Sequence, residues 1–271
     1  MKCALFEESL GLGPEHLVDE PRQDIPRDGE ASRPIILALD TAGLACSVAV
    51  AAGDTVLGAE RIDSVHGQAE ALFPMVDRVM ATARLGPAAL DLIAATVGPG
   101  SFTGIRVGLA AARGIALATR AELVGVTSFE AVVAGCVQRD RAGRSFLLVS
   151  LESRREDLYA QLFDPTDNPL NAGSALLPAD LVDAVKIAID QGPLLIAGDA
   201  AGRAAEALEG RLETVQTVLL EGSAPDAIGV LRAALRRIRL GKTEPSIRPL
   251  YLRSPDVTFS TTLRNANLLR A

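Results

Sequence analysis

Polar and glycine residues that could hold a phosphate group lie where apolar, strand-like runs end. Asp40 and Thr41 follow the first run, IILAL, and Gly198 and Asp199 follow a later run, LLIA. Carboxylate and hydroxyl oxygens bind a phosphate-bound metal, and glycine lets the backbone approach a phosphate closely. These four residues are our candidates for a phosphate site. The alternative at Asp40 is an Asx-type turn that satisfies its own backbone.

A third turn, GPGSFTG, separates the apolar run 92–97 from a helix that begins near Ser101 or Thr103. With the run 123–126 that follows, this order is typical of a βαβ unit, and the first N–H groups of such a helix can bind phosphate. However, Ile105 stands where a Walker loop has its lysine, and the glycines are spaced G-x-G-x-x-x-G rather than G-x-G-x-x-G. The alternative is a tight strand-to-helix turn.

Charge and composition exclude several classes of protein. The chain has 271 residues, a net charge of −7 and 3% aromatic residues, which argues against nucleic-acid binding by this chain alone. Cys3, Cys46 and Cys136 are too widely spaced for a disulfide framework or a zinc site. The sequence has no signal peptide and no apolar run of bilayer length, so we expect a cytoplasmic protein that does not contact a membrane.

Apolar periodicity predicts an α/β fold in which a strand–hairpin–helix–strand plan occurs twice. Glu152 stands in the second copy where Asp40 stands in the first. Helices are predicted at 66–83, 101–119, 127–137, 178–190, 202–208 and 223–240. The predicted parts are a flexible extension (1–33), a first domain (34–142), a second domain (143–222), a C-terminal helix that packs back on the first domain (223–241) and an extended tail (242–271).

Two of these helices carry features that need an explanation. Gly104, Gly108 and Ala112 recur every four residues, and each glycine inside a helix costs about 1 kcal/mol relative to alanine. We therefore expect a close neighbour there, either inside the chain or on a partner. The last helix has Ser223 and Asp226 as a capping box. Its arginines are predicted to form a solvated face that suits the helix dipole, with an RNA backbone contact as the alternative: Arg232, Arg236, Arg237 and Arg239.

Five segments of the chain together resemble the TsaB (YeaZ-type) family of tRNA threonylcarbamoyladenosine (t6A) synthesis: ILALDTAGLACSVAV, HGQAEALFPMV, VGPGSFTGIRVGLAAARGIALA, GVTSFEA and PLYLRSPDV. The resemblance covers roughly residues 34–257 and implies two RNase-H-like domains of the actin/Hsp70/sugar-kinase type. It also implies a non-catalytic subunit that supports a TsaD-type subunit, which transfers threonylcarbamoyl to adenosine 37 of tRNA. A TsaE-type ATPase joins through the complex, and a separate enzyme makes threonylcarbamoyl-adenylate.

The same resemblance implies that this chain has no catalytic residue, metal or cofactor of its own. Ser128 and Val132 stand where TsaD-type chains have the histidines of H-x-x-x-H, and neither can replace a histidine ligand. ATP and metal are expected on the partner, and tRNA is expected to bind only indirectly. The competing hypotheses are an independent ATPase or phosphotransferase of the same fold, and a metallopeptidase.

The partner face is expected on the paired helices of the first domain, which would also serve a homodimer of the isolated chain. Its predicted residues are Ala69, Leu72, Phe73, Val76, Gly104, Gly108 and Ala112. On this hypothesis Gly108→Leu abolishes binding of the TsaD-type subunit and leaves the chain folded.

Overall fold

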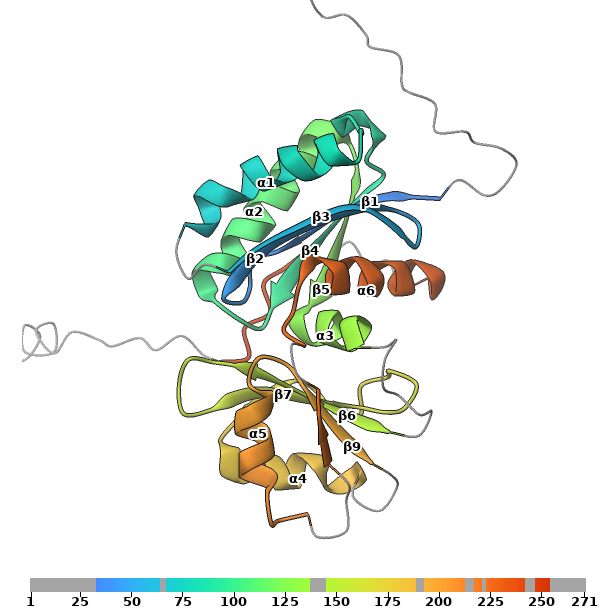
Figure 1. The fold of residues 1–271 in the computed structure, drawn as a ribbon. Helices are drawn as coiled ribbons and strands as arrows, with labels where there is room; N and C mark the ends of the chain where they lie inside the picture. The colour runs from blue at the N-terminus through green and yellow to red at the C-terminus, as the bar shows by residue number, and fades with distance from the viewer. Residues whose placement is uncertain are drawn as a thin grey trace, which may run out of the picture. The chain divides into compact units, whose positions relative to one another are not determined.

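The structure is a computed structural model that describes residues 33–63, 67–136, 145–188, 193–212, 217–220, 223–241 and 247–253. In these ranges the chain forms two five-stranded mixed sheets with helices against their faces (Figure 1). The predicted α/β class is therefore confirmed. The predicted extension up to Ser32, His66 and most of the predicted tail lie outside the described residues.

The first sheet has the strand order β3-β2-β1-β4-β5. β1, β2 and β3 are antiparallel neighbours, whereas β4 pairs parallel to β1 and β5 parallel to β4, as in an RNase-H-like sheet. Its strands are β1 (Ile35–Asp40), β2 (Ala45–Ala52), β3 (Thr55–Asp63), β4 (Leu92–Gly98) and β5 (Glu122–Thr127). The helices of this part of the chain are α1 (Gln68–Thr82), α2 (Phe102–Thr119) and α3 (Ser128–Cys136), with a 3-10 turn, η1 (Pro87–Ala89).

Strand β1 is apolar at nearly every position because helices cover both faces of the sheet. Leu37 and Leu39 pack in one cluster with α1 and α2, whereas Ile36 and Ala38 pack in another with α3 and α6 (Ala227–Arg239). A strand that is buried on both faces loses the alternation of apolar and polar residues that a half-exposed strand shows.

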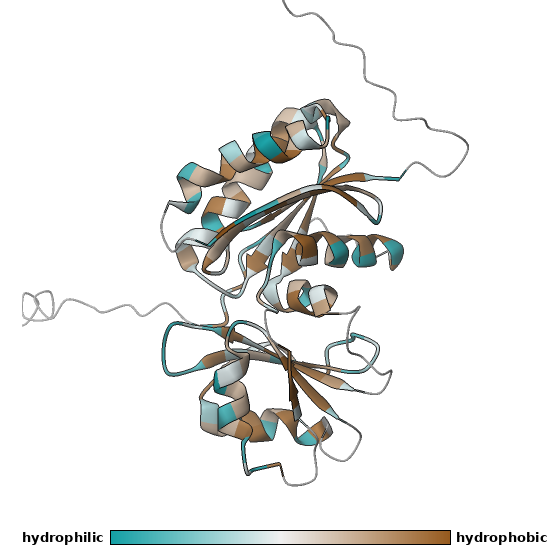
Figure 2. Ribbon diagram, in the orientation of Figure 1, coloured by the Kyte–Doolittle hydropathy of each residue, from teal (hydrophilic) through white to brown (hydrophobic). Residues whose placement is uncertain are grey.

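The second sheet has the order β10-β9-β6-β7-β8 and repeats the same pairing, since β6 and β7 are antiparallel while β6 and β9 are parallel. Figure 2 shows apolar residues concentrated along its strands. The strands are β6 (Phe146–Glu152), β7 (Leu158–Phe163), β8 (Ser174–Leu176), β9 (Leu194–Ala197) and β10 (Thr217–Leu219). The helices are α4 (Leu181–Val185) and α5 (Ala201–Leu208), with 3-10 turns η2 (Pro178–Asp180) and η3 (Lys186–Ala188).

Helix α3 contributes to the packing of both sheets. Its Ala131 belongs to the cluster of the first sheet, while Phe129, Val132 and Val133 pack against the second sheet. α4 and α5 cover the other face of the second sheet. Helix α6 contacts β1, β2 and α3, and its Gly229 lies so close to α3 that a Cβ there would overlap the carbonyl oxygen of Ala131.

The capping box predicted for the helix that became α6 is wrong in detail. Asp226 alone caps the helix, since its side chain accepts from the Gly229 N–H at 2.7 Å. Ser223 instead donates to the carbonyl oxygen of Leu220 (2.7 Å) and accepts from the Gly198 N–H (2.9 Å). Pro225 precedes the cap, and its carbonyl accepts from Arg61.

The arginines of α6 do not form a merely solvated face. Arg237 makes a bidentate contact with Glu130 of α3, with distances of 2.8 to 3.0 Å, and Arg239 pairs with Asp54. Arg236 donates to the carbonyl oxygens of Thr166 and Asp167 in the loop after β7; these two distances are 2.8 and 2.9 Å. The helix is thus fixed to both sheets by side chains that sequence reasoning had placed in solvent.

Candidate functional site

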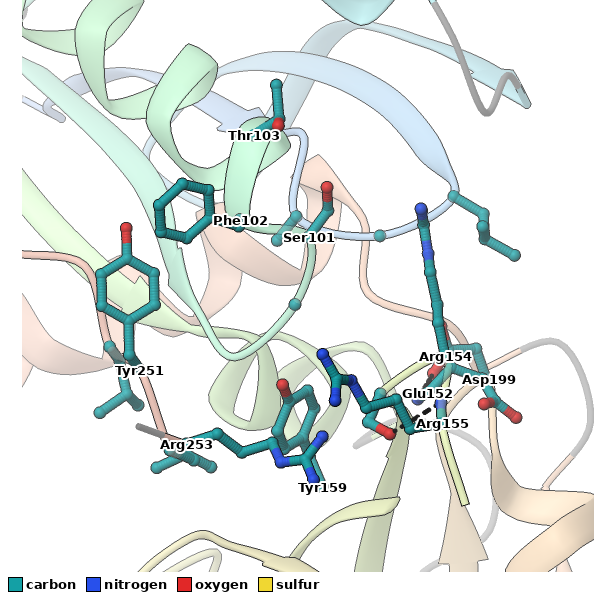
Figure 3. Close-up of a pocket in the computed structure, with 17 residues that line it drawn as sticks. Ser101, Phe102, Thr103, Glu152, Arg154, Arg155, Tyr159, Asp199, Tyr251 and Arg253 are labelled. Carbon is teal, nitrogen blue, oxygen red and sulfur yellow. Dashed lines mark hydrogen bonds between the residues drawn. The ribbon is translucent and has the colours of Figure 1, made fainter. Parts of the chain in front are cut away.

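A pocket of about 370 Å³ lies where several loops meet (Figure 3). Four groups of residues line it: the turn after β1, the start of α2, the turn between β6 and β7 with Asp199, and the segment 250–253. That last segment is held by the Leu250 N–H, which donates to the Val97 carbonyl at 2.7 Å, and by the Tyr251 hydroxyl, which accepts from Arg106 at 3.1 Å. These contacts close one side of the pocket.

The glycine turn before α2 packs against the turn after β1. The Ser101 N–H donates to the carbonyl oxygen of Ala42 at 2.7 Å, and a Cβ at Gly100 would overlap that same oxygen. The Ser101 hydroxyl caps α2 by accepting from the Gly104 N–H at 3.2 Å. Two N–H groups that a phosphate loop would offer to a ligand are therefore used within the chain, as the alternative of a tight turn requires.

Asp40 and Thr41 do not reach the pocket. Both are buried; Asp40 accepts from the Ala42 N–H at 3.1 Å, and Thr41 donates to the carbonyl oxygen of Gly104 at 2.7 Å. Removal from water raises the pKa of the Asp40 carboxyl. The Asx-type turn accounts for the contact of Asp40 Oδ1, and the assignment of Asp40 and Thr41 to a phosphate site stays a prediction.

Replacing the buried carboxyl should change the pH dependence of stability. In the folded chain the pKa of Asp40 is raised above its usual 3.8. As the pH rises, the Asp40 carboxyl therefore ionises in the unfolded chain before it ionises in the folded chain, and this lowers the free energy of unfolding of the wild type. Asp40→Asn keeps an oxygen for the Ala42 N–H and cannot ionise. We expect its stability relative to the wild type to rise from about pH 4 upward in urea unfolding.

The control for that measurement is Asp77→Asn, which replaces an exposed carboxyl of α1. It makes the same Asp-to-Asn change at an exposed position and is measured over the same pH range. An Asp40→Asn difference that varies no more with pH than that of the control would show that burial of Asp40 does not disfavour its ionised form.

Of the second pair of predicted phosphate residues, Gly198 and Asp199, only Asp199 lines the pocket. Gly198 is committed to the fold, because its N–H donates to Ser223 and a Cβ would overlap the Ser150 carbonyl oxygen. Asp199 does line the pocket, and its carboxylate accepts from the Glu152 N–H at 2.9 Å. Desolvation raises the pKa of the Asp199 carboxyl, and the neighbouring Glu152 carboxylate raises it further.

Sequence reasoning missed most of the functional groups of the pocket. Arginines and tyrosines from the β6–β7 turn, β7 and the segment 250–253 line it: Arg154, Arg155, Tyr159, Tyr251 and Arg253. Glu152 accepts from Arg203 at 2.7 Å, and Arg253 pairs with Asp157 at 3.2 Å. No spacing in the sequence connects these residues, since the two segments lie about a hundred positions apart.

The two positions that match the histidine ligands of TsaD-type chains are part of the packed interior of this chain. Ser128 and Val132 are buried, and the Ser128 hydroxyl donates to the Pro99 carbonyl oxygen at 2.7 Å. Within the ranges that the structure describes, no group of three or more His, Cys, Asp or Glu side chains is placed to hold a metal ion.

Five of the seven predicted interface residues are engaged inside this chain. Leu72, Val76 and Ala112 are buried in the cluster between the sheet and its two helices. Gly104 and Gly108 face Thr41, which a Cβ at either position would contact. The small-residue stripe of α2 thus serves an intramolecular approach, and Gly108→Leu is expected to damage the fold itself.

Ala69 and Phe73 are the two predicted interface residues that α1 leaves exposed, Phe73 by 51%. A partner could contact these two without opening the core. Among the helices in the described ranges, none has both the length and the apolar character needed to cross a bilayer.

Comparison with protein families gives a match at residues 34–177, just over half of the chain, to the model described as TsaD: tRNA N6-adenosine threonylcarbamoyltransferase. The tRNA threonylcarbamoyladenosine biosynthesis protein TsaB of Escherichia coli K12 is 31% identical over 54% of this chain and 64% of its own length. The protein of the same name from Haemophilus influenzae is 30% identical over 46% of this chain and 51% of its own length. The chain thus matches between half and two thirds of these two relatives.

Solved structures give the same fold over most of the chain. A Pseudomonas aeruginosa protein described as similar to the peptidase YeaZ superposes with a TM-score of 0.70 at 24% identity, covering 81% of this chain and 100% of its own. YeaZ from the same organism gives 0.67 at 22% identity, again over 81% of this chain and 100% of its own. At these identities the likeness establishes the fold.

Proposed function

Because this chain belongs to the TsaD family of tRNA N6-adenosine threonylcarbamoyltransferases, in its TsaB (YeaZ-type) branch, we propose that it takes part in t6A synthesis on tRNA. In this proposal it is a non-catalytic subunit that binds and supports a TsaD-type subunit. The partner holds the metal and ATP, and a TsaE-type ATPase joins through the complex.

The observation that supports the subunit role is a pair of exposed apolar side chains, one on each of the two helices that cover one face of the first sheet. Phe73 of α1 is 51% exposed and Leu117 of α2 is 86% exposed, although both helices bury apolar residues on their other sides. Exposed aromatic and aliphatic side chains on rigid helices are typical anchors of protein interfaces. The same face would serve a homodimer of the isolated chain.

The proposal is tested by reconstitution. Labelled threonine is incorporated into tRNA by a TsaD-type subunit, a TsaE-type ATPase and the adenylate-forming enzyme, with and without this chain. We expect incorporation to depend on the chain and to be absent with the chain alone. Equal incorporation with and without it would contradict a role in t6A synthesis.

A charged residue at the exposed helix face should separate binding from folding. Phe73→Asp is expected to weaken binding of the TsaD-type subunit at least about 10-fold, since loss of an interface anchor commonly costs 2 kcal/mol or more. Leu177→Asp is the control, because Leu177 is similarly exposed, at 48%, but lies beside the second sheet. Wild-type affinity of a folded Phe73→Asp variant would exclude this face as the interface.

A further inference from the structure

A second and larger hollow follows helix α6, and it shares no lining residue with the pocket at the start of α2. Its volume is about 1080 Å³, just above the usual range for small-molecule sites of about 300 to 1000 Å³. Its lining extends along α6 from Leu231 to Gly241, which is about 15 Å of helix. We call this hollow the α6 groove. Its size and length suit a segment of polypeptide.

Apolar side chains from both sheets and from the helices between them line the α6 groove. Helices α3 and α6 lie side by side (Figure 1), and the turn between β2 and β3 and the loop after β7 complete the walls. At one end, Val56 is 39% exposed and Leu240 is 53% exposed. Apolar side chains that a concave surface leaves exposed are typical of sites where another protein docks.

The walls of the α6 groove are held in place by contacts within the chain. Arg237 binds Glu130 of α3, and Arg239 pairs with Asp54 in the turn between β2 and β3. Arg236 donates to two carbonyl oxygens of the loop after β7, at 2.8 and 2.9 Å. The groove is therefore preformed, and a partner binds to it without first having to order it.

Arg232 is the arginine of α6 that forms no hydrogen bond or ion pair with any residue in the described ranges. Its side chain is half-buried and lines the α6 groove. Removing a charged group from water costs free energy unless an opposite charge lies close by. The lining has four arginines against three acidic residues, in a chain whose net charge is −7. A half-buried guanidinium group at this place therefore indicates an anionic group on the occupant.

We propose that the α6 groove binds a segment of a partner protein that carries a carboxylate beside apolar side chains. The carboxylate accepts two parallel hydrogen bonds from Arg232, and the apolar side chains pack on Val56 and Leu240. A nucleic-acid backbone fits less well, because the fold already holds the other three guanidinium groups of the groove. This site goes beyond the proposed role in t6A synthesis and does not depend on it.

The probe is a library of random peptides of about 12 residues displayed on phage, since such a peptide spans about 18 Å as a helix. The library is selected on the full chain and counter-selected on the Arg232→Glu variant, which removes peptides that bind other surfaces. We expect the enriched peptides to share an acidic residue flanked by apolar residues. The most enriched peptide is then synthesised with a fluorescent label, and its Kd is measured by anisotropy.

Arg232→Glu should weaken binding of this peptide at least about 10-fold, because two like charges then meet. The milder Arg232→Gln should weaken it in the same direction, and urea unfolding verifies that both variants are folded. Arg84→Glu is the matched control, since Arg84 is exposed and does not line the groove. It should keep the wild-type affinity.

The apolar part of the proposal is tested by Leu240→Ser, which should weaken the peptide at least about 3-fold. Its control is Leu117→Ser, because Leu117 is exposed on α2 and does not line the groove. Equal affinities of the Leu240→Ser variant and the wild type would contradict the apolar contact.

Three further results would overturn the proposal. The first is that no peptide with an acidic residue is enriched after counter-selection. The second is that a single-stranded RNA oligonucleotide displaces the labelled peptide as strongly as the unlabelled peptide does, which would make the groove a phosphate site. The third is a dimer of the wild type that Arg232→Glu dissociates in sedimentation, which would make a second copy the occupant. None of these measurements uses the t6A assay, so failure of this site and failure of the proposed function are separable.

Discussion

Gly104→Ala is expected to lower the free energy of unfolding by about 1 to 3 kcal/mol, although alanine favours a helix. A Cβ at position 104 would overlap the carbonyl oxygen of Thr41 and lie 3.0 Å from the Gln68 side chain. Thr41 cannot retreat, because it is buried and its hydroxyl donates to the Gly104 carbonyl oxygen. Helix α2 would have to move away from the turn after β1. Urea unfolding measures the loss.

Gly114→Ala, in the same helix, is the matched control. Gly114 is exposed and a Cβ there meets no atom within 4 Å, so the substitution should raise the free energy of unfolding by about 1 kcal/mol. Opposite signs for the two substitutions would establish that packing on Thr41, rather than helix propensity, fixes glycine at position 104. A stabilised Gly104→Ala variant would contradict this close approach.

Glu130→Ala is expected to cost about 2 to 4 kcal/mol of the free energy of unfolding. The carboxylate of Glu130 accepts from the N–H and the hydroxyl of Thr127, both at 2.9 Å, and from two nitrogens of Arg237. It thereby joins the start of α3 to α6 in one partly buried network. Its loss leaves the Arg237 guanidinium half-buried without this partner.

Glu60→Ala is the comparison for that variant, because Glu60 also pairs with an arginine, Arg78, at 2.6 Å. The two glutamates are about equally exposed (28% and 29%), but Arg78 is 55% exposed against 28% for Arg237. The Glu60 pair also links no helix to another, and pairs with an exposed partner contribute little to stability. Equal losses for the two variants in urea unfolding would mean that the α3–α6 network adds nothing beyond a surface ion pair.

The layers of the fold could be predicted from short-range patterns in the sequence. The continuous apolar run of β1 predicts a buried strand, and the apolar periodicity of α1 predicts a helix. The structure places them at 35–40 and 68–82. The start of α6 was misjudged because Ser223 and Asp226 are both good cap residues. The choice between them depends on Gly198, which binds Ser223 from another part of the chain.

The contents of the pocket could not be predicted in the same way. Arg154 and Tyr251 meet there only because the chain returns past α2 after the second sheet is complete. For a related reason, the glycine stripe of α2 did not reveal which neighbour packs against it. A helix with small residues needs a close neighbour, and its spacing does not say whether that neighbour is a partner or Thr41, 63 positions earlier.

The position of α6 has a consequence for synthesis on the ribosome. Ile36, Ala38, Ala49 and Ala51 of the first sheet pack in one cluster with α6, which the ribosome adds only after all five strands of the second sheet. Until residue 239 has emerged from the ribosome, this face of the first sheet remains partly exposed to water. The apolar area whose burial stabilises these strands is then incomplete. The first sheet therefore reaches its full burial only after the second sheet has been synthesised.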